Sequence, residues 1–458
     1  MSIAQRAVIA VLLMISFYVF AFGIAGALLG LAYLQVISGH IFLKIVLAMV
    51  IFALIIIWAV LPRWDFFKAP GPELKATDYP ELFRGIGELA NKCGHPVPRH
   101  IYLLHDANAW VTQRGGIMGF FSKPVMAIGL PLFKILTTEQ LFAVIAHEFG
   151  HFVGGDTRLG PWIYKTRQAI GRTINSINSW IKHAFIWYGN MFLRITQAIS
   201  RQQEFSADAL AAQYVGKTAI KSALEKISNE GVKYDSYFNA EVAPLLERGF
   251  MPDIDGGYAQ ALKNTKFVSN VETSFVSGEK SPYDSHPPLA ERVAAIEALA
   301  DAKVAATNEK PALSLLQGDI SVLEKKLYEF ILKIQLKDLA WNESVEVAYK
   351  PLWTELVENN TRWLGKPDAD TIFKMAQNLD ETVKRIDKSA KLSELGADQV
   401  LLILQILGAA LALRLLENGY TAKIEIGSEW EFTKGDKKIN PFSLMHEATN
   451  SETQKPEF

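Results

Sequence analysis

Two histidines and a glutamate stand together in the segment AHEFGHF, which covers residues 146–152. His147 and His151 are four residues apart, so on a helix their side chains share one face, with Cβ atoms about 5–6 Å apart. Two imidazoles at this spacing can bind one metal ion, and Zn²⁺ accepts neutral nitrogen ligands together with a carboxylate. Glu148 then lies beside the metal, where it can take a proton from a metal-activated water. The alternative is a pair of ordinary surface histidines.

The residues around this segment predict a buried helix that positions it. Thr137 and Gln140 form a capping-box pattern at the expected start of the helix. Gly154 and Gly155 follow the motif and are typical of a helix end. The apolar positions between them are spaced for one buried face: Leu141, Phe142, Val144, Ile145 and Phe149.

A catalytic zinc site keeps three protein ligands and one open position, so a third ligand has to come from later in the chain. The segment RQQEFSADALAA, residues 201–212, offers Glu204. Asp208 follows on the same helical face, from which it could accept a hydrogen bond from the second ring nitrogen of a ligating histidine and orient the ring. The alternative is a solvated pair of acidic residues on a helix surface.

The first sixty residues are far more apolar than the rest of the chain. No charged residue occurs in 7–37, and a second apolar run at 41–61 contains only Lys44. Each run is long enough to cross about 30 Å of hydrocarbon, and the first is too long for a cleaved signal peptide. We therefore expect a transmembrane helical hairpin over residues 1–64. Its flanking basic residues favour cytoplasmic ends, namely Arg6 before the hairpin and Arg63, Lys68 and Lys75 after it.

Length and composition leave room for more than one domain. The 458 residues carry a net charge of −1, which gives no indication of nucleic-acid binding, and we expect none. The single cysteine, Cys93, excludes an internal disulfide. Short strands at 101–104 and 125–130 predict a small sheet before the motif helix, and a free edge of that sheet could bind an extended polypeptide by strand addition.

Four segments occur in an order that points to a known family. They are HDANAW at 105–110, HEFGH at 147–151, RQQEFSADALA at 201–211 and SHPPLAERVAAI at 285–296. Together they resemble the HtpX-like and CAAX prenyl endopeptidase family of integral membrane zinc metallopeptidases, in the gluzincin group. The resemblance runs from about residue 70 to residue 306.

The resemblance implies one Zn²⁺ per chain, bound by His147, His151 and Glu204. It further implies that Glu148 is the general base and that Asp208 supports one of the ligands.

The resemblance also gives roles to two residues whose spacing alone carries no such information. Asn108 would lie near the substrate strand, and His286 would contact the substrate carbonyl or the developing oxyanion. From spacing alone, His286 before Pro287 and Pro288 marks the start of a helix.

Residues 161–200 depart from the family pattern, because the HtpX branch carries two further membrane spans at this place. Here the segment holds basic residues throughout, and its longest uncharged run between Lys182 and Arg194 is too short to cross a bilayer. Aromatic and basic residues together favour helices at the membrane surface, or helices that gate the cleft. Two amphipathic helices within the soluble core are the alternative.

We expect an α-rich α+β zincin (gluzincin) catalytic domain with a small β-sheet over residues 65–307. A mostly helical accessory domain of unknown role is expected over residues 308–458. Within it, the apolar run 400–416 is short for a membrane span and fits a buried helix better. Strand-like residues at 423–426 and 430–432 predict a small hairpin.

These observations predict a membrane-anchored zinc metalloendopeptidase that hydrolyses peptide bonds with a zinc-activated water. We expect it in the cell (inner) membrane, in contact with the lipid bilayer and with its catalytic domain in the cytoplasm. The family resemblance implies membrane protein quality control, with membrane or unfolded polypeptides as substrates. Two alternatives stay open: a membrane-tethered binding or assembly protein with a structural zinc, and a protease that processes one specific partner.

Overall fold

The structure is a computed structural model, and it groups into two compact units. The first unit comprises Met1–Gly231 and Gly278–Ile331, and the second comprises Val232–Ser277 and Leu332–Phe458. The chain therefore leaves the first unit, returns to it and leaves again. The structure describes residues 3–39, 42–61, 66–115, 122–153, 160–177, 181–276, 287–300, 309–423, 425–427 and 430–450.

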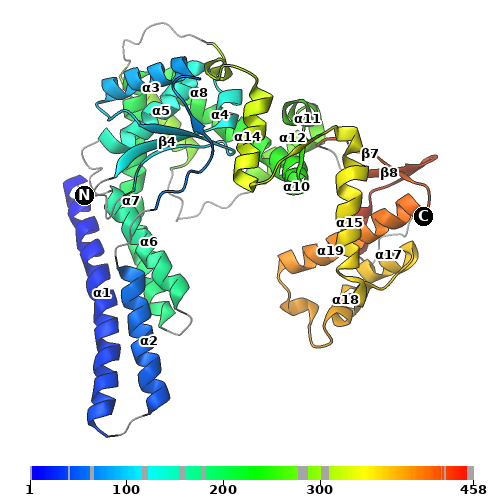
Figure 1. The fold of residues 1–458 in the computed structure, drawn as a ribbon, viewed down its shortest axis with the longest axis horizontal. Helices are drawn as coiled ribbons and strands as arrows, with labels where there is room; N and C mark the ends of the chain where they lie inside the picture. Colours follow the sequence, from blue (N-terminus) through cyan, green and yellow to red (C-terminus); the bar gives the residue numbers. More distant parts are fainter. Residues whose placement is uncertain are drawn as a thin grey trace. The chain divides into compact units, whose positions relative to one another are not determined.

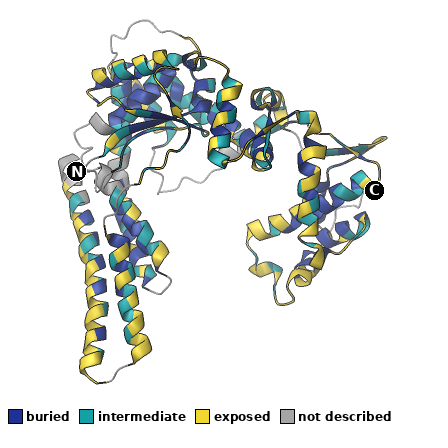
Figure 2. Ribbon diagram, in the orientation of Figure 1, coloured by how far each residue is buried: buried dark blue, intermediate teal, exposed yellow. Residues whose placement is uncertain are grey.

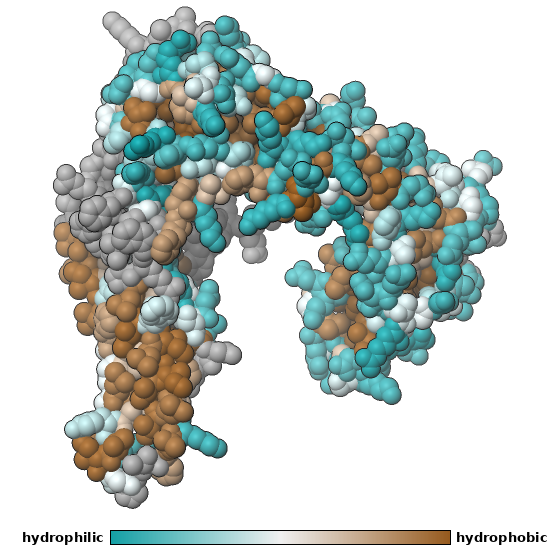
Figure 3. Space-filling model, viewed as in Figure 1, coloured by the Kyte–Doolittle hydropathy of each residue, from teal (hydrophilic) through white to brown (hydrophobic). Residues whose placement is uncertain are grey.

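Helices α1 (Ile3–Ile37) and α2 (Leu43–Val60) form the predicted N-terminal hairpin. Most of its outward side chains are apolar and exposed, as the yellow ribbon of Figure 2 and the brown surface of Figure 3 show. Segments Val11–Ile37 and Leu43–Val60 are both long and apolar enough to cross a membrane. An apolar surface of this size is stable only when a bilayer covers it.

Helix α19 (Ala397–Glu417) is the third helix in the described part of the chain that is long and apolar enough for a span. It belongs to the core of the second unit, where it packs against α15 (Lys350–Glu358), α17 (Ala369–Gln377) and α20 (Pro441–Ala448). More than half of its apolar window (56%) is buried, against 22% for each hairpin helix. Its apolar face is covered by protein, as expected of a core helix.

Helix α6 (Gly160–Ser176) and the first half of α7 (Lys182–Tyr214) pack against the hairpin, with α6 beside α2 in Figure 1. Ile170 and Phe185 share a core with Phe17 of α1 and Ile56 of α2. This core is separate from the one around the sheet. The described apolar side chains of this segment therefore belong to the core of the hairpin and not to that of the sheet domain, which was one of the alternatives considered above.

A four-stranded sheet precedes the motif helix, as the strand patterns predict. It consists of β1 (Glu73–Leu74), β2 (His100–Leu104), β3 (Ala109–Arg114) and β4 (Lys123–Gly129), in the order β1-β2-β4-β3. Strands β2 and β4 are parallel, and β3 pairs antiparallel with β4 as an edge strand. The helices around it share its core: α3 (Pro80–Cys93), α4 (Leu130–Ile135), α5 (Thr138–Val153) and α8 (Lys217–Lys226).

The segment after residue 308 begins inside the first unit, which differs from the boundary expected at residue 307. The backbone N–H of Ala312 donates to the carbonyl of Leu136, and that of Thr138 donates to Lys310. Helix α14 (Ile320–Leu332) adds a largely buried ion pair between Glu324 and Lys134, at 2.7 Å. Helix α14 has both apolar and ionic partners in the core of the first unit and therefore belongs to that unit.

The second unit combines two stretches of the chain through a short parallel pair, β5 (Phe250–Pro252) with β6 (Lys337–Leu339). Residues 232–277, expected in the catalytic domain, lie here as helices such as α9 (Val232–Tyr237), α10 (Ala243–Glu247), α11 (Ile254–Ala261) and α12 (Thr265–Val276). The predicted hairpin is a three-stranded sheet of β7 (Thr421–Lys423), β8 (Glu431–Lys434) and β9 (Lys437–Ile439).

Candidate metal centre

Helix α5 begins where the capping pattern predicts. The side chain of Gln140 accepts a hydrogen bond from the backbone N–H of Thr137 at 3.0 Å, and the Thr137 hydroxyl accepts one from the Gln140 N–H at 3.3 Å. Two N–H groups without helical partners are satisfied in this way, which fixes the start of the helix. Leu141, Ile145 and Phe149 are buried in the sheet core. Gly154 and Gly155 lie outside the described residues.

A glycine lets α5 and α7 approach closely. A Cβ atom at Gly150 would lie 2.6 Å from the Cα of Ala207, closer than atoms can pack. Only glycine leaves room for the backbone of α7 at this point. Ala207 lies between Glu204 and Asp208 in the sequence. The close approach of α7 to Gly150 therefore brings both carboxylates near the histidines of α5.

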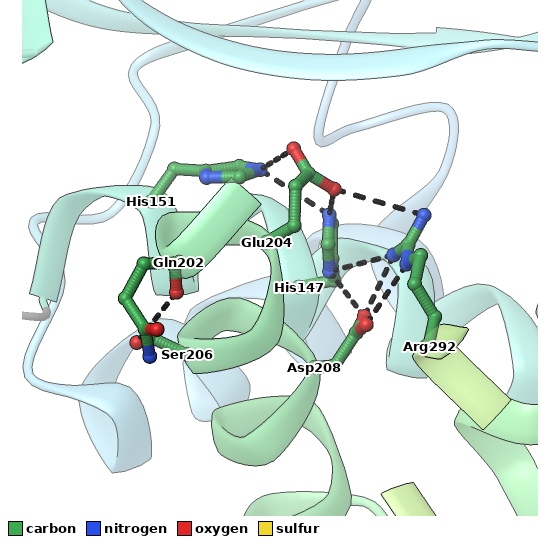
Figure 4. Close-up of polar contacts among 7 residues, drawn as sticks. All are labelled: His147, His151, Gln202, Glu204, Ser206, Asp208 and Arg292. Atoms are coloured by element: carbon green, nitrogen blue, oxygen red, sulfur yellow. Dashed lines mark hydrogen bonds and ion pairs between the residues drawn. The ribbon is translucent and has the colours of Figure 1, made fainter. Parts of the chain in front are cut away.

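The ligand candidates meet across this contact (Figure 4). The Nε2 atoms of His147 and His151 are 3.2 Å apart. Glu204 lies between them, with Oε2 3.6 Å from His147 Nε2 and Oε1 3.6 Å from His151 Nε2. For metal–ligand bonds of 2.0–2.1 Å in a tetrahedron, two ligand atoms are about 3.3–3.4 Å apart. Two imidazoles and one carboxylate at these separations fit Zn²⁺, with the fourth position open. Among the described residues, His147, His151 and Glu204 form a group of side chains that could hold a metal ion.

Asp208 holds His147 from the side opposite the metal position. Its Oδ1 accepts a hydrogen bond from His147 Nδ1 at 2.9 Å, which leaves Nε2 free to bind a metal. Asp208 is 1% exposed. Burial alone would raise the pKa of its carboxyl, but hydrogen bonds from Arg292 and His147 and their charges hold the pKa below its ordinary value. The carboxylate therefore ionises more readily than an ordinary aspartate.

Arg292, on α13 (Leu289–Glu297), completes the site and was not among the predicted residues. Its Nε and Nη2 donate to the two oxygens of Asp208 at 2.9 and 2.7 Å, and its Nη1 lies 3.6 Å from Glu204. A signal for it exists in the sequence: Arg292 lies three residues after Leu289 and four before Ile296, on the face expected to be buried. A charged residue at such a position needs a buried partner.

Glu148 is half-buried and contributes to the same electrostatic field. Burial lowers the pKa of the Arg292 guanidinium, but the hydrogen bonds and charge of Asp208, followed by the charges of Glu204 and Glu148, outweigh burial and raise its pKa. A fixed positive charge among these carboxylates limits their mutual repulsion.

Of the two residues that were predicted only from the family resemblance, the structure describes one, Asn108. Asn108 is exposed at the start of β3, where its side-chain oxygen accepts from the N–H of Ala109 at 2.9 Å. Its backbone carbonyl accepts from Gly129 at 2.7 Å, which ties it to the end of β4. His286 lies outside the described residues.

Comparison with known proteins agrees with this arrangement. Residues 77–300, which contain the motif helix, the two carboxylates of α7 and Arg292, match peptidase family M48. This chain carries an HtpX-like domain of peptidase family M48. With the apolar hairpin, the M48 domain makes the protein an integral membrane metallopeptidase.

Curated relatives of the M48 domain share the name HtpX. The chain is 26% identical to Protease HtpX of Idiomarina loihiensis over 272 residues, which cover 54% of this chain and 82% of that protein. It is 28% identical to Protease HtpX of Legionella pneumophila over 245 residues, which cover 47% of this chain and 74% of that protein. A Protease HtpX homolog of Gemmatimonas aurantiaca is 25% identical over 249 residues, 49% of this chain and 77% of its own length. No solved structure matches the chain significantly.

Proposed function

We propose that this protein is a membrane-anchored zinc metalloendopeptidase in which His147, His151 and Glu204 bind one Zn²⁺. The observation that carries the proposal is that one ligand atom from each of these residues lies within 4.8 Å of the other two, at the contact of α5 with α7. Glu148 adds a carboxylate that this ligand set does not need, and a structural zinc site has no use for one beside it.

When bound, Zn²⁺ supplies a Lewis acid that polarises the scissile carbonyl and makes water a nucleophile near neutral pH. Glu148 takes the proton of the attacking water and later passes it to the leaving amine. Asp208 fixes His147 so that Nε2 points to the metal position, and Arg292 keeps Asp208 charged and oriented. His286 is proposed to donate a hydrogen bond to the developing oxyanion, a contribution of about 3 kcal/mol by analogy with other such donors.

The substrate is proposed to be a polypeptide that binds as an added strand along β3, the edge strand next to α5. Asn108 at the start of β3 is proposed to contact it. The role is proposed to be membrane protein quality control, as the family resemblance implies. The basic residues that flank the hairpin support a catalytic domain on the cytoplasmic side of the inner membrane.

The test compares the detergent-purified full chain with its Glu148→Gln variant, using an unfolded reporter protein and a zinc determination on both. We expect one zinc per chain in both proteins and cleavage by the wild type alone. If both bind zinc and neither cuts, the alternative of a binding protein with structural zinc is favoured. Glu204→Ala is the second variant, and retention of stoichiometric zinc there would remove Glu204 from the ligand set.

A further inference from the structure

Helix α7 connects the N-terminal hairpin with the metal cluster. Near its start, the Tyr188 hydroxyl donates to the carbonyl of Leu13 at 2.6 Å and lies 2.5 Å from the Ser16 hydroxyl, both on α1. Further along, the same helix carries Glu204 in the metal cluster. Sixteen residues separate Tyr188 from Glu204, which corresponds to about 24 Å along an α-helix.

The contacts of Tyr188 lie two and five residues inside the start of the apolar span of α1. The apolar span of α1 begins at Val11, and that of α2 ends at Val60. Arg172 of α6 donates to the carbonyl of Ala59 at 3.2 Å, in the last turn of α2. From Ser16 to Ile37, α1 rises about 32 Å, which matches a hydrocarbon thickness of about 30 Å.

Between these two places α7 is held as one rigid element. Gly189 directly follows Tyr188, and there α7 packs so closely on α6 that a Cβ atom would lie 3.1 Å from Ile170. The remaining residues, 190–204, contain neither glycine nor proline, which are the usual causes of a helix kink. Midway, the Arg167 guanidinium of α6 donates to the Thr196 hydroxyl at 2.8 Å. Phe185 and Phe192 are fully buried against the hairpin core, and Ala207 is fully buried against α5.

We propose that α7 is a rigid spacer that holds the metal centre about 24 Å from the edge of the hydrocarbon core of the bilayer. The proposal rests on the proposed peptidase function and defines its substrates further. An extended chain covers about 3.3–3.6 Å per residue, so a membrane-anchored substrate reaches the metal only with about seven residues beyond its span. An average helix tilt of about 20° shortens the distance by less than a tenth. Bonds closer to the membrane are protected from cleavage.

The experiment co-reconstitutes the full chain in liposomes with substrates that carry one Leu/Ala span and a cleavable unfolded segment. Spacers of about 3, 6, 9 and 12 residues separate the two, or about 10–40 Å when extended. We expect the shortest spacer to lower the cleavage rate at least tenfold relative to the longest, because a linker that cannot span the distance brings the effective concentration near zero. Mass spectrometry gives the cleaved bond nearest the span, expected at about the seventh residue or beyond.

The matched controls are the same cleavable segments without the span. If these soluble segments are cut at equal rates and the anchored series shows the expected threshold, the spacer proposal holds. If the soluble segments are cut and the anchored substrates are cut equally at every spacer length, the spacer proposal is wrong while the peptidase function stands. If the soluble segments are not cut either, the proposed function itself fails.

Discussion

The guanidinium of Arg292 donates two hydrogen bonds, 2.9 and 2.7 Å long, to a carboxylate of Asp208 that is almost completely buried. Asp208 in turn accepts from the ring of His147. The two residues lie 84 positions apart in the sequence. His147, the proposed metal ligand on α5, is therefore oriented by a residue of α7, which is itself held by α13.

Replacing Arg292 by Gln should weaken the metal site without touching a ligand. Loss of one partner of a buried ion pair costs about 3–5 kcal/mol, and loss of support for a ligand lowers metal affinity about 10–100-fold. Chelator competition measures the zinc affinity, and chemical denaturation measures the stability. The control is Arg248→Gln, whose partner Glu355 is 59% exposed, so that a loss of at most about 1 kcal/mol is expected. Unchanged zinc affinity in Arg292→Gln would contradict the assignment.

Replacing Gly150 by Ala should separate α5 from α7. The added methyl group would clash with the backbone at Ala207, and overpacking of this kind costs about 1–3 kcal/mol. Because the clash moves Glu204 away from the histidines, zinc content should fall together with the melting temperature. Gly87→Ala in α3 is the matched control, since its Cβ meets open space and should be neutral or stabilising by up to about 1 kcal/mol. Equal behaviour of the two variants would contradict the close approach.

The stability of the second unit should fall as the pH rises toward 7. Burial raises the pKa of Glu241 to about 7, although the N–H of Gly427 donates to it at 3.3 Å and lowers the pKa in part. A folded-state pKa above the unfolded value means that the native state binds the proton more tightly. The contribution is complete below the ordinary value of 4.5 and is lost as the pH rises through about 7.

Glu241→Gln keeps the acceptor for Gly427 and removes the titration. We expect this variant to match the wild type at pH 4 and to exceed it in stability at pH 8, as measured by denaturant unfolding. Glu346→Gln, at an exposed ion pair with Lys350, is the control. An unchanged pH profile in Glu241→Gln would show that this carboxyl does not carry the effect.

Cys93, the single cysteine, should report unfolding of the first unit. The thiol is buried, and burial raises its pKa to about 11, so it is protonated and inaccessible at pH 8. We expect no reaction with a disulfide reagent under native conditions and one equivalent of reaction in denaturant. Rapid labelling of the native protein would show that the core of the first unit does not cover the thiol.

Much of the metal centre follows from local sequence. The spacing of His147 and His151, the capping pair Thr137 and Gln140, and the apolar face of α5 all depend on neighbours within one helix. Such short-range signals predict the helix and the direction of its histidines. Glu204 follows from the number of ligands that zinc requires, since its own surroundings in the sequence carry no comparable signal.

The remainder depends on contacts between distant segments. Arg292 pairs with Asp208 across 84 residues, and spacing shows only that Arg292 lies on a face expected to be buried. The return of residues 309–331 to the first unit is decided by Lys134 with Glu324 and by the backbone contacts of Ala312. The position of α6 depends on whether the hairpin or the sheet domain offers it a complementary apolar face, which composition alone cannot distinguish.

The first unit is built from two separate stretches of the chain, so its residues are synthesised at different times. Asp208 leaves the ribosome 84 residues before Arg292, and all of Val232–Ser277 is made in between. At roughly 5–20 residues per second this delay is about 4–17 s. Throughout that interval both histidines and Glu204 already exist, while the buried carboxylate behind His147 has no guanidinium to meet. The support of His147 through Asp208 is therefore complete only after α13 has been synthesised.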